Sequence, residues 1–189
     1  MMKTNFPLIM KSLAGLTSAV TVGLVLSYWY WGLGWMLTAA ISFGTTAYHF
    51  VMRLAVGFVV PRLTRYDFDY RHPWFQSRSW ETAFYKKLRL HRWTGQLPTY
   101  APEQFDLKTN SLHQIIQNMC GAEVVHEMIM ALSFLPLVLV PVFGEIFVFM
   151  VTSVCAAAID GLFVMAQRYN RPRVVRIYER KEKRTYEQG

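Results

Sequence analysis

Apolar residues dominate four stretches of the chain, which cover about residues 12–30, 36–60, 112–140 and 146–166. From residue 12 to residue 52 there is no Asp, Glu, Lys or Arg. At about 1.5 Å per residue, a helix of that length would be about twice as long as the hydrocarbon core of a bilayer is thick, so it suffices for two spans. In lipid, backbone polar groups must be paired within the segment, and four strands cannot close a barrel. The expected fold class is therefore all-α, a bundle of four transmembrane helices.

The connections between these stretches differ in length and in charge. Short turns are predicted at 32–34 and 141–144, where glycine or proline occurs. The segment 61–111 is long, aromatic and basic, which is typical of a loop on the membrane surface. Within it, residues 81–90 are predicted to form one short interfacial helix. We expect residues 1–189 to form a single integral membrane domain.

Composition agrees with a membrane protein and orients it. Hydrophobic residues make up 53% of the chain and charged residues only 17%, against about a quarter in soluble domains. Of the 20 Lys and Arg residues, 19 lie in the N-terminus, the loop 61–111 or the tail 167–189. The positive-inside rule places these parts in the cytoplasm, so we predict a multi-pass plasma membrane protein with both termini cytoplasmic. A net charge of +8 on a membrane face does not indicate nucleic acid binding.

Three other features of the spans can be interpreted in more than one way. The N-terminal stretch resembles a cleaved signal peptide, but it continues through the aromatic residues 28–31 without a small-residue cleavage site, so we expect it to be retained. Arg53 lies near the cytoplasmic end of the second span and is expected to extend toward the interface. Asp160, an acid inside the fourth span, requires a partner.

Polar residues gather on one side of the third span. At 100° per residue, His113, Gln117, Cys120, Glu123 and Glu127 share that side of a helix. Ionisable groups within the hydrocarbon core are energetically costly unless they are paired or hydrated, so this set is a candidate functional site.

The proposed chemistry of this site centres on His126. Glu123 and His126 are three residues apart and can meet on a helix, and a carboxylate that holds one imidazole nitrogen leaves the other free as a base. Glu127 is the second candidate for that orienting role. The alternative is a polar stripe that only joins helices, as in a non-enzymatic scaffold or a transporter subunit. Cys120 is either a nucleophile or a small packing residue.

Metal and soluble-acyltransferase motifs are incomplete in this sequence. The spacing of Glu123 and His126 matches half of a di-iron carboxylate site, but no second Glu-x-x-His occurs. The zinc protease motif that His126 and Glu127 begin has Met130 where its second histidine must stand. No histidine is followed five residues later by aspartate, so the His-x4-Asp acyltransferase signature is absent. No resident metal or cofactor is predicted, and an intramembrane metal-dependent enzyme stays the third alternative.

Two cytosolic clusters suit phosphate binding, because Lys and Arg gather where helices leave the membrane. They lie in the segments 84–98 and 167–173. The candidate substrate-binding residues are Lys86, Arg92, Trp93, Arg168, Asn170, Arg171 and Arg173, together with His113 and Cys120 of the third span.

These same segments resemble a known family. The runs 84–88, 92–93 and 97–98, then Glu123 and His126, then Gln-Arg-Tyr-Asn-Arg-Pro-Arg at 167–173, are similar to the small membrane glycosyl-4,4'-diaponeurosporenoate acyltransferases of the staphyloxanthin pathway. The resemblance covers about residues 81–173. It implies transfer of a fatty acyl chain from a donor such as acyl-CoA to a hydroxyl of a membrane glycolipid. In that interpretation His126 is the base, Glu123 or Glu127 orients it, and the basic residues hold the phosphates of the donor.

Overall fold

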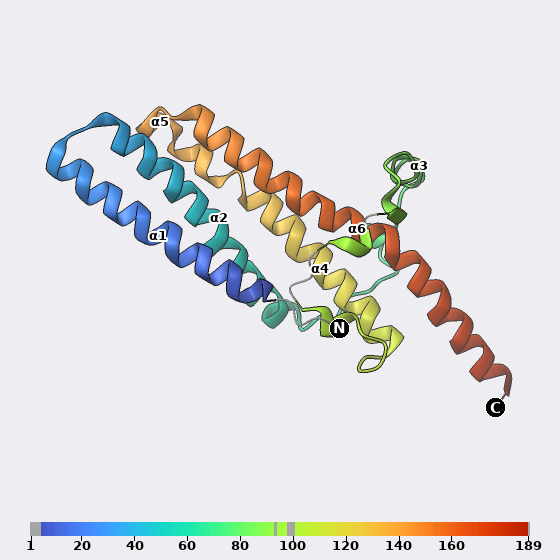
Figure 1. Cartoon of the computed structure of the whole chain (residues 1–189). Coiled ribbons are helices and arrows are strands. Elements are labelled where there is room, and N and C mark those ends of the chain that lie inside the picture. Colours follow the sequence, from blue (N-terminus) through green and yellow to red (C-terminus); the bar gives the residue numbers. More distant parts are fainter. Residues whose placement is uncertain (1–4, 93, 98–100, 189) are drawn as a thin grey trace. The chain divides into compact units, whose positions relative to one another are not determined.

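The computed structural model describes residues 5–92, 94–97 and 101–188, and these residues form helices and no strand. The α-helices are α1 (Phe6–Trp31), α2 (Gly34–Thr64), α3 (Ser79–Lys87), α4 (Leu112–Leu132), α5 (Val140–Phe143) and α6 (Ile146–Gln188) (Figure 1). Short 3-10 helices are η1 (Pro73–Phe75), η2 (Leu90–Arg92), η3 (Thr94–Gln96), η4 (Pro102–Phe105) and η5 (Leu135–Leu139). The prediction of an all-helical protein is confirmed.

Four helical segments are long and apolar enough to cross a membrane, as the hydrophobic pattern predicted. They are Phe6–Trp31, Gly34–Thr64, Leu112–Phe143 and Ile146–Gln188. The chain is therefore a multi-pass membrane protein. Its orientation and the identity of its membrane stay predictions.

The turn between the first two helices depends on a glycine. Gly32 ends α1 with a φ of 67°, and its N–H donates to the carbonyl of Tyr28 at 2.7 Å. This left-handed conformation costs glycine little, because glycine has no Cβ. The turn falls within the predicted segment 32–34.

The third predicted span, 112–140, is not one continuous α-helix. α4 ends at Leu132, and the chain continues through η5 and α5 to Phe143. Pro136 and Pro141 explain this, because proline lacks the N–H that the ladder needs and its ring clashes with the preceding turn.

The fourth span continues far beyond residue 166. The segment 167–189 was expected to be a basic tail, but α6 is helical to Gln188 and, at about 1.5 Å per residue, is about 64 Å long. The extension is rich in Arg, Lys and Glu, which favour helices, and pairs such as Tyr178 with Glu182 lie one turn apart. Such a length exceeds a hydrocarbon core of about 30 Å, so part of α6 extends beyond it.

The helix predicted at 81–90 exists with different bounds. α3 spans Ser79–Lys87, and Arg89 has a φ of 51°, a left-handed conformation that prevents the helix from continuing. Whether it lies at the membrane surface stays a prediction. Glu81 and Tyr85, one turn apart on α3, are both buried in the protein.

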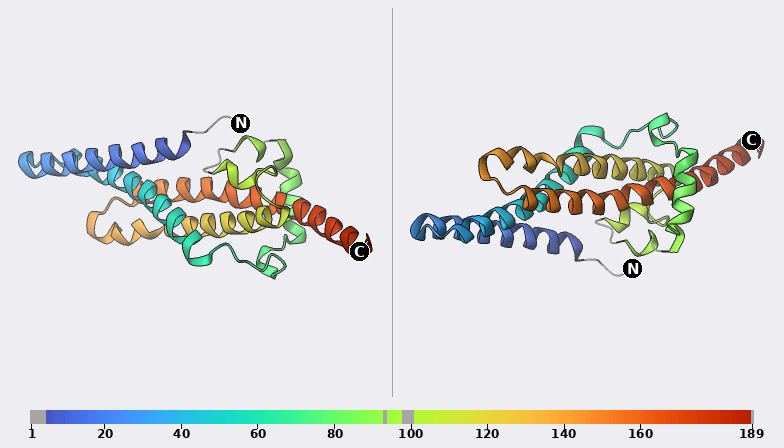
Figure 2. Two further views of the ribbon diagram at one scale, coloured as in Figure 1. Left: turned by 90° about the horizontal axis from the view of Figure 1, so that it is seen from below. Right: turned by 90° about the horizontal axis from the view of Figure 1, so that it is seen from above.

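The chain forms two compact units. Unit 1 contains Met1–Val59 and Glu127–Gly161, and within it α2 and the first part of α6 run in the same direction (Figures 1 and 2). Here Arg53 pairs with Asp160 and also donates to the carbonyl of Ala156 at 3.1 Å. Arg53 is therefore bound to a carboxylate on α6, which supplies the partner that Asp160 requires, and its depth in the membrane stays a prediction.

Unit 2 contains Val60–His126 and Leu162–Gly189, so the loop 61–111 belongs to it. Phe75, Ile116 and Cys120 form its buried core. The amide of Gln117 exchanges two hydrogen bonds of 2.8 Å with the backbone of Phe68, which attaches the loop to α4. Part of the aromatic loop therefore packs against protein and not only against the membrane.

Candidate functional site

The centre of unit 2 is a buried carboxylate between two arginines. Glu123, on α4, has no exposed surface, and one carboxylate oxygen accepts from Nη1 of Arg168 at 2.7 Å. The other oxygen accepts from Nη1 of Arg171. Both arginines lie on α6, so this contact joins α4 to α6 through charge-assisted hydrogen bonds.

Arg168 connects this centre to α3 as well. Its Nε and Nη2 donate to the two carboxylate oxygens of Glu81 at 3.1 and 3.0 Å, in the bidentate geometry that suits a guanidinium group. The same side chain donates to the backbone carbonyls of Trp74 and Gln76. Arg168 is thus held between two carboxylates.

Arg171 is more deeply buried than Arg53 or Arg168, with only 2% of its surface exposed. Besides Glu123, it donates to the carbonyl of Phe75, and its guanidinium lies 5.0 Å from the centroid of the Phe75 ring. We name Glu81, Glu123, Arg168 and Arg171 the charge network. Two negative and two positive side chains make it neutral overall, which is what a buried charge cluster requires.

Tyr85 borders the network at Glu81. Its hydroxyl donates to Glu81 at 3.3 Å, and the residue is buried. Burial, followed by the negative charge of Glu81, raises the pKa of Tyr85 to about 12. The phenol therefore stays protonated and acts as a donor at neutral pH.

His126 lies one turn further along α4 than Glu123, about 4.5 Å along the helix axis. Its ring stacks on Phe163 of α6, with centroids 4.6 Å apart and planes inclined by only 8°. The imidazole is half-buried. This stacking restricts the plane of the ring, which is a requirement for directed proton transfer.

A basic pocket of about 290 Å³ opens beside the network. Four basic side chains line it, and the other lining residues include hydroxyl groups, with no acidic residue among them. The lining residues are Ser77, Thr82, Tyr85, Lys86, Arg168, Tyr169, Pro172, Arg173 and Arg176. Positive charge with hydroxyl donors is the chemistry that binds phosphate. The side chain of Arg173 is held over the Tyr169 ring, 4.4 Å from its centroid.

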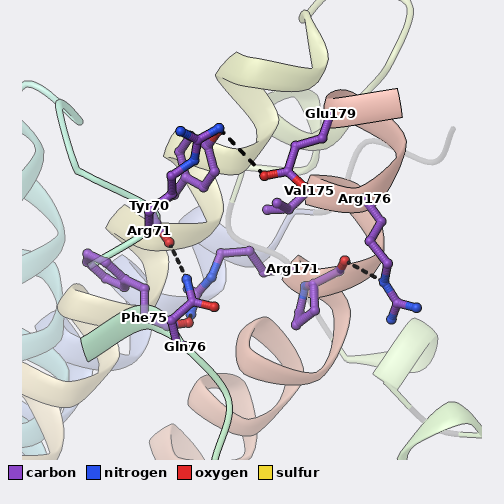
Figure 3. A pocket seen from close by; sticks show the side chains of 9 residues that line it. Tyr70, Arg71, Phe75, Gln76, Arg171, Val175, Arg176 and Glu179 are labelled. Carbon is purple, nitrogen blue, oxygen red and sulfur yellow. Dashed lines mark hydrogen bonds and ion pairs between the residues drawn. The ribbon is translucent and has the colours of Figure 1, made fainter. Parts of the chain in front are cut away.

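A second pocket, of about 390 Å³, is amphipathic (Figure 3). Tyr70, Phe75 and Val175 give it apolar walls, and Arg71 lies 3.7 Å from Glu179 across it. The presence of that carboxylate makes this pocket less suited to a phosphate than the basic pocket.

The structure brings together part of the predicted site. Lys86, Arg168 and Arg173 line the basic pocket, and Glu123, Arg168 and Arg171 meet in the charge network. Cys120 is fully buried in the core of unit 2, where it packs as a small apolar residue. The remaining predicted residues are placed as follows: His113 is exposed beside the Tyr178 ring, Arg92 is exposed, Asn170 and Glu127 are half-buried, and Trp93 lies outside the described residues.

The sequence reasoning missed several residues of this region. Glu81, Tyr85, Tyr169 and Arg176 all border the network or the basic pocket. Tyr85 and Tyr169 fall within the basic segments 84–98 and 167–173, and the spacing of Glu81 and Tyr85 places both on one face of a short helix. In the described part of the chain, no three His, Cys, Asp or Glu side chains are grouped closely enough to hold a metal ion.

Comparison with known proteins gives one match. The family model CrtO, described as glycosyl-4,4'-diaponeurosporenoate acyltransferase, matches residues 71–180. This range covers more than half of the chain and includes every residue of the charge network and of the basic pocket. No curated protein and no solved structure gives a significant match.

Proposed function

We propose that this protein, which belongs to the glycosyl-4,4'-diaponeurosporenoate acyltransferase family, transfers a fatty acyl group to a hydroxyl of a membrane glycolipid. The family makes the chain an acyltransferase, and its four apolar helices make it a membrane protein. The observation that carries the proposal is that a basic pocket and a half-buried imidazole lie in the same compact unit, both inside the matched region.

The basic pocket is the proposed site for the phosphates of the acyl donor. The charge of Arg168 is balanced by Glu81 and Glu123, so the unbalanced positive charge of the pocket comes from Lys86, Arg173 and Arg176. Three cations over a small volume attract a group with more than one negative charge, such as a phosphate monoester or a pyrophosphate. This differs from the sequence hypothesis, in which Arg168 and Arg171 bind the donor directly.

The spacing along α6 favours a donor with a long arm. Phe163, which stacks on His126, precedes Arg173 by ten residues, or about 15 Å along the helix. A donor whose phosphates bind at Arg173 can present its acyl carbonyl to His126 only if an extended linker separates the two. Acyl-CoA has such a linker, whereas an acyl phosphate does not.

His126 is the proposed general base. It takes the proton from the acceptor hydroxyl, the oxygen forms an ester bond with the acyl carbon, and the bond from the acyl carbon to the donor sulfur breaks. The protonated imidazole then returns the proton to the leaving thiolate, so the step is balanced. Phe163 holds the plane of the ring.

Glu123 takes a different role in this proposal from the one that the sequence suggested. Two guanidinium groups bind its oxygens, so its carboxylate serves as their ion-pair partner. It is a positioning residue, which fixes α6 against α4 so that Arg168 can shape the pocket wall.

The reaction is tested by lipid mass spectrometry of cells that produce the protein or its variants. The wild type is expected to add a fatty acyl mass to a glycolipid. His126→Gln should abolish that product, because glutamine keeps the volume and hydrogen bonding but cannot take up the proton. Equal folded yield in detergent is the control. An unchanged lipid profile with the wild type, or full activity of His126→Gln, contradicts the proposal.

The donor site is tested separately with purified protein and acyl-CoA. Arg173→Ala and Arg176→Ala are expected to raise the KM for the donor, each by about 10-fold for a lost charge-assisted contact. Arg180→Ala is the matched control, since Arg180 is an exposed arginine of α6 that lines neither pocket. Equal KM values for all three variants would show that the pocket does not bind the donor.

The second candidate function is a non-enzymatic scaffold or transporter subunit. The charge network favours it, because a neutral cluster that connects α3, α4 and α6 is also what helix packing requires. In that case His126→Gln would change neither the lipid profile nor the folded yield, whereas variants of the network would change the yield alone.

A further inference from the structure

Unit 1 contains two buried polar side chains whose hydrogen-bonding capacity is unused. His49, on α2, is 5% exposed, and Ser153, on α6, is fully buried. Within the described part of the chain, neither ring nitrogen of His49 nor the hydroxyl oxygen of Ser153 has a hydrogen-bond partner. A buried polar atom without a partner is costly, so these groups indicate a ligand that completes them.

The pair of Arg53 and Asp160 places both groups in one interface. His49 precedes Arg53 by one turn of α2, and Nη1 of Arg53 donates to the His49 carbonyl at 3.2 Å. On α6, Ser153 precedes Asp160 by seven residues, which returns it to the same face. The two helices run in the same direction (Figures 1 and 2), so, counted from the Arg53–Asp160 contact, His49 lies four residues back and Ser153 seven, a difference of about 4.5 Å along the axis.

The neighbouring polar groups have their own partners. The hydroxyls of Thr45 and Thr46 donate to carbonyls one turn earlier at 2.7 and 2.8 Å. The hydroxyl of Tyr48 donates to the carbonyl of Leu132 at 2.8 Å. Arg53 is bound to Asp160 and to two carbonyls. Among the described residues, these neighbouring groups therefore leave none to complete His49, which points to a group from outside the chain.

The chemistry of the two side chains defines this ligand. A neutral imidazole offers one donor and one acceptor, and a serine hydroxyl offers both. An anion cannot donate to the imidazole, and the cation that would attract it, Arg53, is neutralised by Asp160. A metal ion would require several ligands, and in the described part of the chain no three His, Cys, Asp or Glu side chains are grouped closely enough to hold one. A neutral hydroxyl group satisfies every requirement.

We propose that His49 and Ser153, supported by the Arg53–Asp160 pair, form a hydroxyl-binding site within the membrane-spanning unit. The bound group is the O–H of a water molecule or of a hydroxylated lipid. It bridges the imidazole and the serine hydroxyl across α2 and α6. His49 lies outside the matched residues 71–180 and Ser153 lies inside them, but neither belongs to the charge network or lines the basic pocket.

The test uses the full-length protein with ¹⁵N-labelled histidine in lipid nanodiscs. Solid-state NMR measures proton magnetisation transfer to the ring nitrogens, first from water and then from lipid, and His49→Gln assigns the His49 signal. Ser153→Ala removes one side of the site. Ser133→Ala is the matched control, because Ser133 is equally buried but donates to the carbonyl of Ile129 at 2.8 Å.

Early transfer from water to His49 that is lost in Ser153→Ala and kept in Ser133→Ala supports the proposal with water as the ligand. Transfer from lipid alone, together with a hydroxylated lipid that co-purifies in a one-to-one ratio, supports it with a lipid hydroxyl. If neither source reaches the ring, or if both serine variants behave alike, the site is a dry packing defect and the proposal is overturned.

Discussion

Replacing Glu123 with glutamine removes one negative charge from the charge network and keeps the size of the side chain. The structure shows which arginine loses its negatively charged partner. Arg168 keeps its bidentate contact with Glu81, but Arg171 is left with the carbonyl and the ring of Phe75. The variant therefore buries one uncompensated guanidinium, on a residue of which only 2% is exposed.

The expected loss of unfolding free energy follows from this one unpaired buried charge. Breaking a buried ion pair by removing one partner destabilises proteins by about 3–5 kcal/mol. The exposed pair of Lys183 and Glu187, with atoms 3.9 Å apart, provides the control, and Glu187→Gln should cost less than about 1 kcal/mol. The measurement is the free energy of unfolding in mixed micelles titrated with denaturing detergent.

A double variant separates charge from packing. Glu123→Gln combined with Arg171→Met removes both charges, so most of the lost stability should return, because apolar groups of similar volume replace buried ion pairs at little cost. If Glu123→Gln costs no more than Glu187→Gln, the network is not a buried charge cluster. If Arg171→Met restores nothing, the loss comes from packing and not from the unpaired cation.

Two further predictions concern unit 2. Burial raises the pKa of Tyr85 from 10.0 to about 12, so the stability that the neutral phenol contributes is complete below about pH 10 and is lost as the pH rises toward 12. In that window the unfolding free energy of Tyr85→Phe should fall less steeply with pH than that of the wild type. Equal slopes for the two proteins would show that the phenol is exposed. Gly121→Ala places a Cβ against the Tyr66 ring and should cost about 1–3 kcal/mol of unfolding free energy. Gly23→Ala, which meets open space, should be neutral or stabilising, and equal effects of the two glycine variants would contradict the close contact.

The sequence allowed the membrane class and the region of the site to be predicted, but not the contacts within that site. Glu123 was singled out because an acid in an apolar segment is costly, and that argument holds for any fold. Its partners could not be derived, since Arg168 and Arg171 lie 45 and 48 residues further along the chain. Glu81 was missed because an acid in a polar loop carries no such cost until the loop folds over it.

Hydrophobic length and charge distribution by themselves determined that this protein crosses a membrane four times with helices. These are local properties, because the requirement to pair backbone groups in lipid applies to each segment independently. Only the tertiary structure decided which charges neutralise one another, which bases line a pocket, and that Arg53 pairs with Asp160. Those outcomes depend on how distant segments pack, and neutralising a buried charge requires a partner within a few ångströms, at a position that no local pattern specifies.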